Sequence, residues 1–125
     1  MSNTPTRATI YEDSGVTCMA RIQGDDAAYI TQATTSTIVL KTFKNVSTTA
    51  TSTTSLTVSS TVFDALQTNS RWSKDTTGYN FLFAVPASVF DAGDATYRLE
   101  FYFTPTSGSA YWVMYSIDTV QVFSS

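Results

Sequence analysis

The chain of 125 residues contains no histidine and only one cysteine, Cys18. Without histidine, the usual Ser-His-Asp and Cys-His catalytic arrangements and the commonest zinc ligand are excluded. A single cysteine also excludes an internal disulfide framework. Cys18 lies in an alternating apolar stretch with no neighbouring group that would lower the pKa of its thiol. We therefore predict a small buried side chain at Cys18 and no nucleophile.

Charged residues are also scarce. They make up 14% of the chain, the net charge is -3, and the basic residues are scattered. Nucleic acid is therefore not expected as a partner, because phosphate binding draws on clustered lysine and arginine. No apolar run approaches the length of a membrane-spanning helix, and no N-terminal stretch is organised like a signal peptide. We expect a protein that is made in a cytoplasm and has no membrane partner.

Carboxylates occur close together at two places, as Asp25 next to Asp26 and as Asp91 near Asp94. Such groups can bind calcium, or act as the acid and base in glycoside hydrolysis. Both pairs lie beside a glycine in predicted turns, where aspartate commonly bonds its own backbone, and this is the favoured interpretation. Asp75 is likewise predicted to accept hydrogen bonds within its loop. The five glycines are dispersed and form no phosphate-binding loop, so we predict no catalytic residue, no metal and no cofactor.

The residues in excess are hydroxyl and aromatic ones. Serine and threonine supply nearly a third of the chain, and there are seven tyrosines, eight phenylalanines and two tryptophans. Threonine suits strands, because its branched side chain fits a pleated surface. Bulky apolar residues alternate with other residues over residues 97–103 and again over residues 111–117, with turn-forming residues between them. This pattern predicts an aromatic β-hairpin at the centre of the fold.

Further alternating patterns predict the remaining strands, at residues 8–11, 16–22, 36–44, 55–59 and 79–85. The Ser/Thr-rich residues 47–60 are interpreted as a loop followed by a weak strand, or alternatively as a disordered low-complexity segment. Residues 62–66 have the spacing of a single helical turn or a wound connection. The apolar phase shifts after Ile117, which predicts a β-bulge near Asp118 or Thr119, or a strand that crosses between sheets there.

Together these patterns predict an all-β protein, a single sandwich of about seven to nine mainly antiparallel strands. The sandwich domain is assigned to residues 7–125, and residues 1–6 are predicted to be a flexible N-terminal arm.

Three aromatic residues are candidates for an interface. Tyr102 and Trp112 have the opposite parity to their inward-facing neighbours, and Trp72 lies in a polar setting. Aromatic side chains on the outer face of a sheet indicate a contact surface. The alternative is that loops or the N-terminal segment cover these side chains.

Two stretches carry a resemblance to a known group of proteins. Residues 71–86, which read RWSKDTTGYNFLFAVP, and residues 97–105, YRLEFYFTP, with Gly108 after them, resemble short proteins encoded among the structural genes of tailed bacteriophages. Residues 16–22, 30–33 and 38–43 are similar to the opening strands of immunoglobulin-like β-sandwich domains in phage virion proteins.

The resemblance implies an immunoglobulin-like sandwich and a non-enzymatic structural protein located in the virion. Such a protein would be a capsid decoration (cement) protein or a neck or tail protein. Its implied partners are the major capsid protein or the neck and tail proteins, and it would form a homo-oligomer. The alternative function is a carbohydrate-binding module for host attachment, in which Trp72, Tyr102 or Trp112 stacks on sugar rings.

Overall fold

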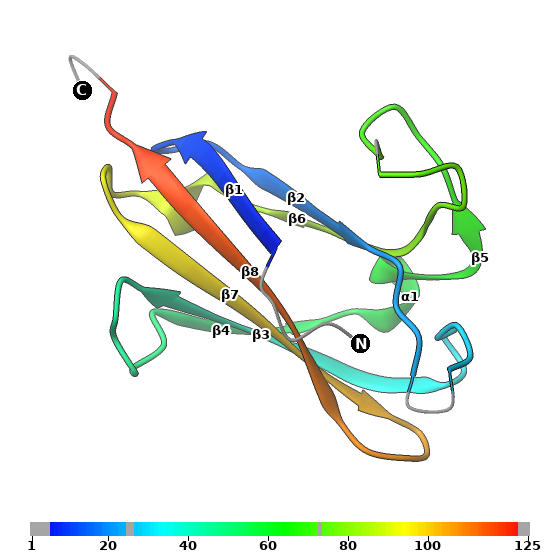
Figure 1. Cartoon of the computed structure of the whole chain (residues 1–125). Coiled ribbons are helices and arrows are strands. Elements are labelled where there is room, and N and C mark those ends of the chain that lie inside the picture. Colours follow the sequence, from blue (N-terminus) through cyan, green and yellow to red (C-terminus); the bar gives the residue numbers. More distant parts are fainter. Residues whose placement is uncertain (1–5, 25–26, 73, 123–125) are drawn as a thin grey trace.

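The computed structural model describes residues 6–24, 27–72 and 74–122 (Figure 1). These residues are nearly all β, which confirms the predicted fold class. The strands are β1 (Thr6–Tyr11), β2 (Val16–Ala20), β3 (Thr35–Lys44), β4 (Ser52–Leu56), β5 (Val62–Gln67), β6 (Tyr79–Val85), β7 (Thr96–Pro105) and β8 (Tyr111–Val120). Two short helical turns, α1 (Val58–Thr61) and the 3-10 turn η1 (Ala87–Phe90), connect them. No helix in the described ranges is long and apolar enough to cross a membrane.

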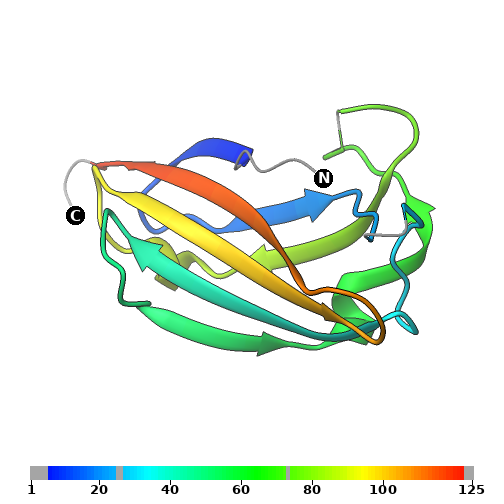
Figure 2. The same cartoon turned by 60° about the horizontal axis from the view of Figure 1, so that its bottom comes forward.

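The strands form two sheets that lie over one another as the layers of a sandwich (Figure 2). The five-stranded sheet has the order β1-β8-β7-β3-β4 and the three-stranded sheet the order β2-β6-β5. All pairs are antiparallel except β1 with β8. In immunoglobulin domains the second, fifth and fourth strands form one sheet, and the third, sixth and seventh form the other. Once β4 is counted as the first of the two extra strands of variable-type domains, the present order is that arrangement, with β1 moved beside β8.

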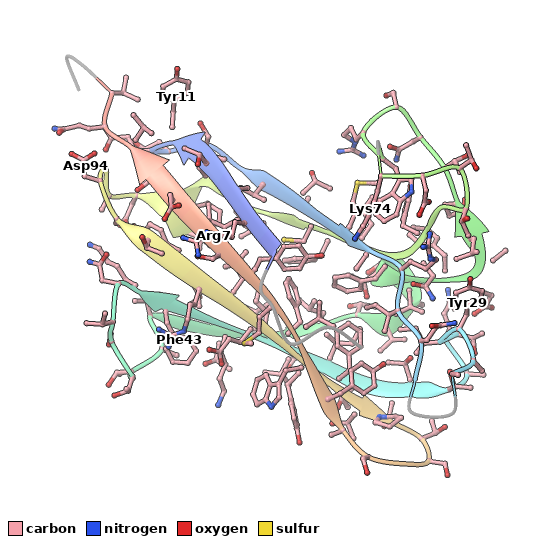
Figure 3. All side chains as sticks on the ribbon, in the orientation of Figure 1. Arg7, Tyr11, Tyr29, Phe43, Lys74 and Asp94 are labelled. Atoms are coloured by element: carbon pink, nitrogen blue, oxygen red, sulfur yellow. The ribbon has the colours of Figure 1, made fainter. Side chains whose placement is uncertain are left out.

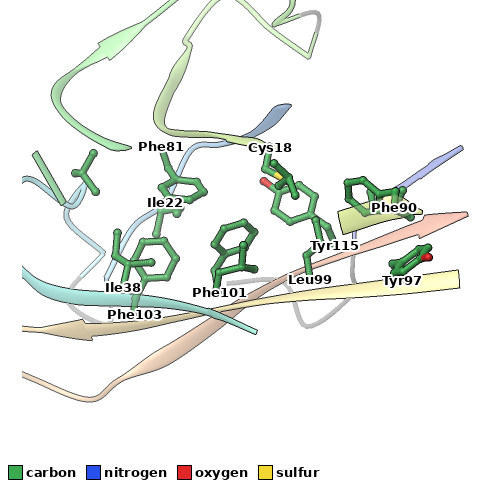
Figure 4. Close-up of a cluster of buried hydrophobic side chains, with 14 of the residues drawn as sticks. Cys18, Ile22, Ile38, Phe81, Phe90, Tyr97, Leu99, Phe101, Phe103 and Tyr115 are labelled. Carbon is green, nitrogen blue, oxygen red and sulfur yellow. The ribbon is translucent and has the colours of Figure 1, made fainter. Parts of the chain in front are cut away.

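The core is built from alternate residues of β7 and from the aromatic residues of β6 that face them (Figure 4). Phe101 and Phe103 are fully buried, and the ring centroid of each lies 5.2 Å from that of Phe81 in an edge-to-face arrangement. Tyr115 on β8 packs edge-on against Phe101, with centroids 5.7 Å apart. Such pairs stabilise by about 0.5–1.5 kcal/mol each beyond the burial of their area. The period-two pattern of the hairpin therefore produces the interior of the sandwich.

The start of β7 carries a tyrosine corner, a feature of immunoglobulin domains. The hydroxyl oxygen of Tyr97 accepts a hydrogen bond from the backbone N–H of Ala92 (3.0 Å), and the hydroxyl donates to Asp91 Oδ1 (3.2 Å). In antibody domains a cysteine two residues after this tyrosine forms a disulfide with the second strand. Here that position is Leu99, and Cys18 lies on β2. Both side chains are buried in the core (Figure 4), so apolar packing replaces the disulfide.

The predicted bulge or crossing after Ile117 is wrong. β8 keeps an unbroken register with β1 up to Val120. Thr119 therefore faces inward, where its hydroxyl donates to the carbonyl of Ala92 (2.6 Å) and accepts from the N–H of Ala95 (3.1 Å). Because these bonds satisfy the buried hydroxyl, the strand stays regular and Val120 is 41% exposed on the other face.

The Ser/Thr-rich segment also differs from the prediction. The strand is β4, slightly earlier than expected, and the helical turn is α1, so Val62 opens strand β5 instead of forming a turn. Ser60 and Thr61 donate their hydroxyls to the carbonyl of Thr57 at 3.0 and 2.9 Å, which favours a turn before Val62. Val62 is then fully buried opposite Phe81. At the N-terminus, β1 begins at residue 6, the last residue assigned to the arm, and the rest of that arm lies outside the described residues.

Candidate functional site

The outer face of the five-stranded sheet carries a patch of apolar and aromatic side chains. Tyr102 on β7 lies directly opposite Trp112 on β8 and opposite Val39 on β3. Side chains directly opposite in a ladder point to the same face, so all three point away from the core. Met114, two residues after Trp112, shares this face. We call these four residues the aromatic patch.

The two rings of the aromatic patch contact each other. The ring centroids of Tyr102 and Trp112 lie 4.3 Å apart with an interplanar angle of 43°. Trp112 remains 44% exposed and Tyr102 is partly exposed. The two side chains therefore face outward, as their parity predicts, while their role as an interface stays a prediction. Met114 follows from the same parity, because it lies two residues after Trp112 on β8. Val39 was not anticipated, because joining it to the patch requires knowing that β3 pairs with β7.

A charged row borders the aromatic patch on the same face. Arg98 Nε donates to Glu100 Oε2 (3.0 Å), and its other nitrogens donate to two carbonyl oxygens of the β3–β4 loop at 3.3 and 3.2 Å. The guanidinium lies 4.6 Å from the ring centroid of Phe43, which is therefore buried although it belongs to the outer face (Figure 3). Lys41 lies opposite Glu100, is exposed, and has no ion pair in the described part of the chain. The face thus has an apolar region beside a polar region whose side chains are hydrogen-bonded to one another and to the β3–β4 loop.

Trp72 does not belong to the aromatic patch. It lies in the loop between β5 and β6, which belong to the other sheet. Its ring packs on Tyr79 with centroids 5.6 Å apart, and its Nε1 donates to Asp75 Oδ1 (3.1 Å). These contacts hold the side chain against its own loop and the first residue of β6. The structure therefore brings together two of the three predicted interface residues, Tyr102 and Trp112.

Asp75 organises that loop. Its carboxylate accepts from Arg21 Nη1 at 3.0 and 2.8 Å, and from the backbone N–H groups of Thr77 (3.1 Å) and Gly78 (3.2 Å). The hydrogen bond from Arg21, followed by that from Trp72, holds the pKa of Asp75 well below its usual range. The predicted role of Asp75 as a loop acceptor is confirmed.

The other residues considered for catalysis or metal binding are a cysteine and two pairs of aspartates. Cys18 is 1% exposed, and burial raises the pKa of its thiol to about 12, so the thiol stays protonated and the prediction of a buried side chain is confirmed. Asp91 accepts from Tyr97, and Asp94 adopts a positive φ of 54° in the turn before β7. Asp25 and Asp26 lie outside the described residues. Within the described ranges, no group of three or more histidine, cysteine, aspartate or glutamate side chains could hold a metal ion.

No protein family, no curated protein and no solved structure matches the chain. The function is therefore inferred from the aromatic patch and its surroundings.

Proposed function

We propose that the chain is a non-enzymatic structural protein of a tailed-phage virion, which docks on the capsid or on the neck or tail through the aromatic patch. The observation that carries the proposal is the exposed cross-strand pair of Tyr102 and Trp112. Tyrosine and tryptophan are the residues that most often dominate binding energy at protein interfaces. The resemblance of residues 71–86 and 97–105 to phage structural proteins supports the choice of partner.

The construction of the patch supports docking. Tyr102 and Trp112 belong to the two strands of the central hairpin. The backbone of Tyr102 is paired on both sides, with β3 and β8, and that of Trp112 is paired with β7. Each ring also restricts the other at 4.3 Å, so binding would order few side chains. Lys41 and Ser55, both exposed on neighbouring strands, lie at its margin. An apolar centre with a polar rim is the usual organisation of an interface.

The test is the protein composition of purified particles of the phage that encodes the chain. We expect the chain to co-sediment with particles at a fixed stoichiometry. A copy number that follows the capsid lattice would indicate decoration, and one that follows the symmetry of the neck or tail would indicate a connector or tail protein. Absence of the chain from purified particles would contradict the proposal.

Variants locate the contact. Trp112→Ala should weaken binding to chain-free particles by about 30-fold or more, the effect of losing about 2 kcal/mol at an interface hot spot. Its unfolding midpoint should stay near that of the wild type, because the ring lies outside the core. Tyr11→Ala is the matched control, since Tyr11 is 66% exposed on β1 and is not part of the patch (Figure 3). Equal binding by both variants would exclude the patch as the docking surface.

The alternative is a carbohydrate-binding module, which the exposed ring of Trp112 also favours, because sugar rings stack on such surfaces. A glycan array separates the two functions. Glycan binding that disappears in Trp112→Ala, from a chain absent from particles, would establish the alternative. An array without binding, together with particle association, supports the structural role.

A further inference from the structure

The two sheets end in four edge strands, β1 and β4 in one sheet and β2 and β5 in the other. An edge strand presents unpaired N–H and C=O groups, which proteins protect with charge, irregular pairing or other coverage. β1 carries Arg7, which is charged, exposed and 3.6 Å from Asp118 (Figure 3). On β2, the carbonyl oxygen of Met19 accepts from the hydroxyl of Tyr115 (2.9 Å). Both edges are thus protected.

β5 is protected by glutamine side chains. Gln32 Nε2 donates to the carbonyl of Val62 (2.9 Å), and Gln67 Nε2 donates to that of Ala65 (2.9 Å). The pairing of β5 with β6 also shifts register between Val62 and Gln67. An irregular strand whose carbonyls are already bonded is a poor template for another chain.

β4 has none of these protections. It consists of four hydroxyl residues followed by Leu56, and no charged residue or proline occurs between Lys44 and Asp64. Its pairing with β3 runs through five residue pairs without a shift. In an antiparallel ladder alternate residues direct both N–H and C=O away from the neighbour, and the described part of the chain supplies no partner for them. β4 is therefore a regular, open edge (Figures 1 and 2).

We infer that two copies of the chain pair antiparallel through β4 and join their five-stranded sheets into one. A two-fold axis at Thr53 or Thr54 places hydroxyl residues opposite hydroxyl residues over most of the strand. With the axis at Thr54, for example, Thr53 faces Ser55 of the second copy. Such cross-strand Thr/Ser pairs are favourable, and no like charges meet. The first four residues of β4 are exposed hydroxyl residues on both faces, and this self-complementary edge favours a second copy over a foreign peptide selected by side-chain pockets.

The dimer would be weak by itself. Pairing of a five-residue edge buries far less than the roughly 800 Å² per partner of a stable interface, so we expect a dissociation constant of about 10 μM to 1 mM. A two-fold axis perpendicular to the sheet keeps both aromatic patches on one side. Five strand spacings and a short offset separate the two Tyr102 side chains by about 25 Å. This consequence rests on the proposed function: the dimer would dock bivalently, and avidity would then compensate for weak pairing.

Cysteine scanning tests the axis. Residues 52–56 are each replaced by cysteine and oxidised, and native Cys18 does not interfere because it is 1% exposed. Only a residue at the axis faces its own copy, so disulfide-linked dimer should peak at Thr53→Cys or Thr54→Cys and fall on either side. Ser59→Cys, exposed in the adjacent helical turn, is the matched control and should stay monomeric. A flat profile, or no cross-linking at any position, would overturn the inference.

Sedimentation equilibrium tests the edge without cysteine. The average mass should rise from 13.6 kDa toward twice that value as the concentration approaches about 1 mM. Thr54→Lys should weaken the dimer at least about tenfold, because two ammonium groups would meet at the interface. Ser59→Lys adds the same charge elsewhere and should behave as the wild type. If Trp112→Ala abolishes the dimer and Thr54→Lys does not, the copies pair through the aromatic patch and the inference fails. Both measurements use the isolated chain, so their outcome is independent of docking on particles.

Discussion

Two buried threonines should respond in opposite directions to the same substitution. Thr42 on β3 is completely buried, and its hydroxyl has no hydrogen-bond partner in the described ranges. Thr119 on β8 is 4% exposed, and its hydroxyl bonds the carbonyl of Ala92 and the N–H of Ala95. Valine has nearly the shape of threonine but lacks the hydroxyl. Replacement by valine therefore isolates the contribution of each hydroxyl.

The expected magnitudes follow from these contacts. An unpaired buried hydroxyl carries a desolvation cost of about 1–3 kcal/mol, so Thr42→Val should raise the free energy of unfolding by about 1 kcal/mol. Thr119→Val loses two hydrogen bonds of about 1 kcal/mol each and leaves the buried N–H of Ala95 without its side-chain acceptor, so it should lower that free energy by about 2 kcal/mol. The two variants should differ by about 3 kcal/mol, or roughly 10 °C in melting temperature for a domain of this size.

Urea unfolding followed by far-ultraviolet circular dichroism measures both free energies. Thr106→Val, at an exposed position in the β7–β8 turn, is the control and should change the free energy by less than about 0.5 kcal/mol. A destabilised Thr42→Val variant would mean that this hydroxyl has a partner. A Thr119→Val variant with unchanged stability would mean that Thr119 does not face the core. That result would favour the β-bulge predicted from the sequence.

Three further outcomes test the fold and its loops. Leu99→Cys should form a disulfide with Cys18 in air, shown by loss of free thiol, and the oxidised form should be about 2–4 kcal/mol more stable than the reduced one in urea; failure to oxidise would contradict the facing of β2 and β7. Tyr97→Phe leaves a backbone N–H of the preceding turn unpaired and should lower the free energy of unfolding by about 1–3 kcal/mol, whereas no change would exclude a stabilising tyrosine corner. The pKa of Asp75 is lowered in the folded chain, so its carboxylate stabilises the fold above about pH 4, and this contribution is lost as the pH falls through the lowered pKa. The stability difference between the wild type and Asp75→Asn should accordingly shrink as the pH falls from about 6 to about 2, and a difference independent of pH would contradict the ion pair.

The sequence predicted strands well where one face is buried by the opposite sheet. The expected strand at residues 79–85 has the bounds of β6, and the expected hairpin is β7 and β8. In these strands large apolar side chains alternate, and their burial against the other sheet stabilises the fold. The signal is local, so no knowledge of strand pairing is needed to detect it.

The errors occur where a hydroxyl residue takes an inward position. Thr119 faces the core because two backbone groups of the turn before β7 bond its side chain, and these groups lie more than twenty residues away. Near Val62, hydroxyl bonds to the carbonyl of Thr57 decide where the helical turn ends. In both cases the deciding partner is a backbone group whose position the alternation of apolar residues does not encode. In a chain with so much threonine, the alternation of apolar residues often leaves open whether a hydroxyl residue faces the core or the solvent.

The candidate site was predictable only in part for a similar reason. Parity along β7 and β8 is local, and it placed Tyr102 and Trp112 on the outer face. Val39 joins them through the pairing of β3 with β7, a contact between distant parts of the sequence. Parity alone would also expose Phe43, yet the guanidinium of Arg98 covers it. Trp72 lies apart from the patch, and among its polar neighbours Asp75 accepts a hydrogen bond from the indole nitrogen, so its role at an interface stays a prediction.

The aromatic residues fall into a buried group in the core and an exposed pair on the outer face of the five-stranded sheet, and this division indicates which surface to test for binding. The aromatic residues of β6 and the inward residues of β7 fill the interior, while Tyr102 and Trp112 contact each other outside it. With only 14% charged residues, the chain has little charge to oppose association through an exposed tryptophan on the outer face of a sheet. Such a side chain does not pack in the core, and in the free protein it favours non-specific association. That combination is favourable when the face is covered by a partner, which is why the aromatic patch, and not the loop of Trp72, is the surface on which a role in assembly should be tested.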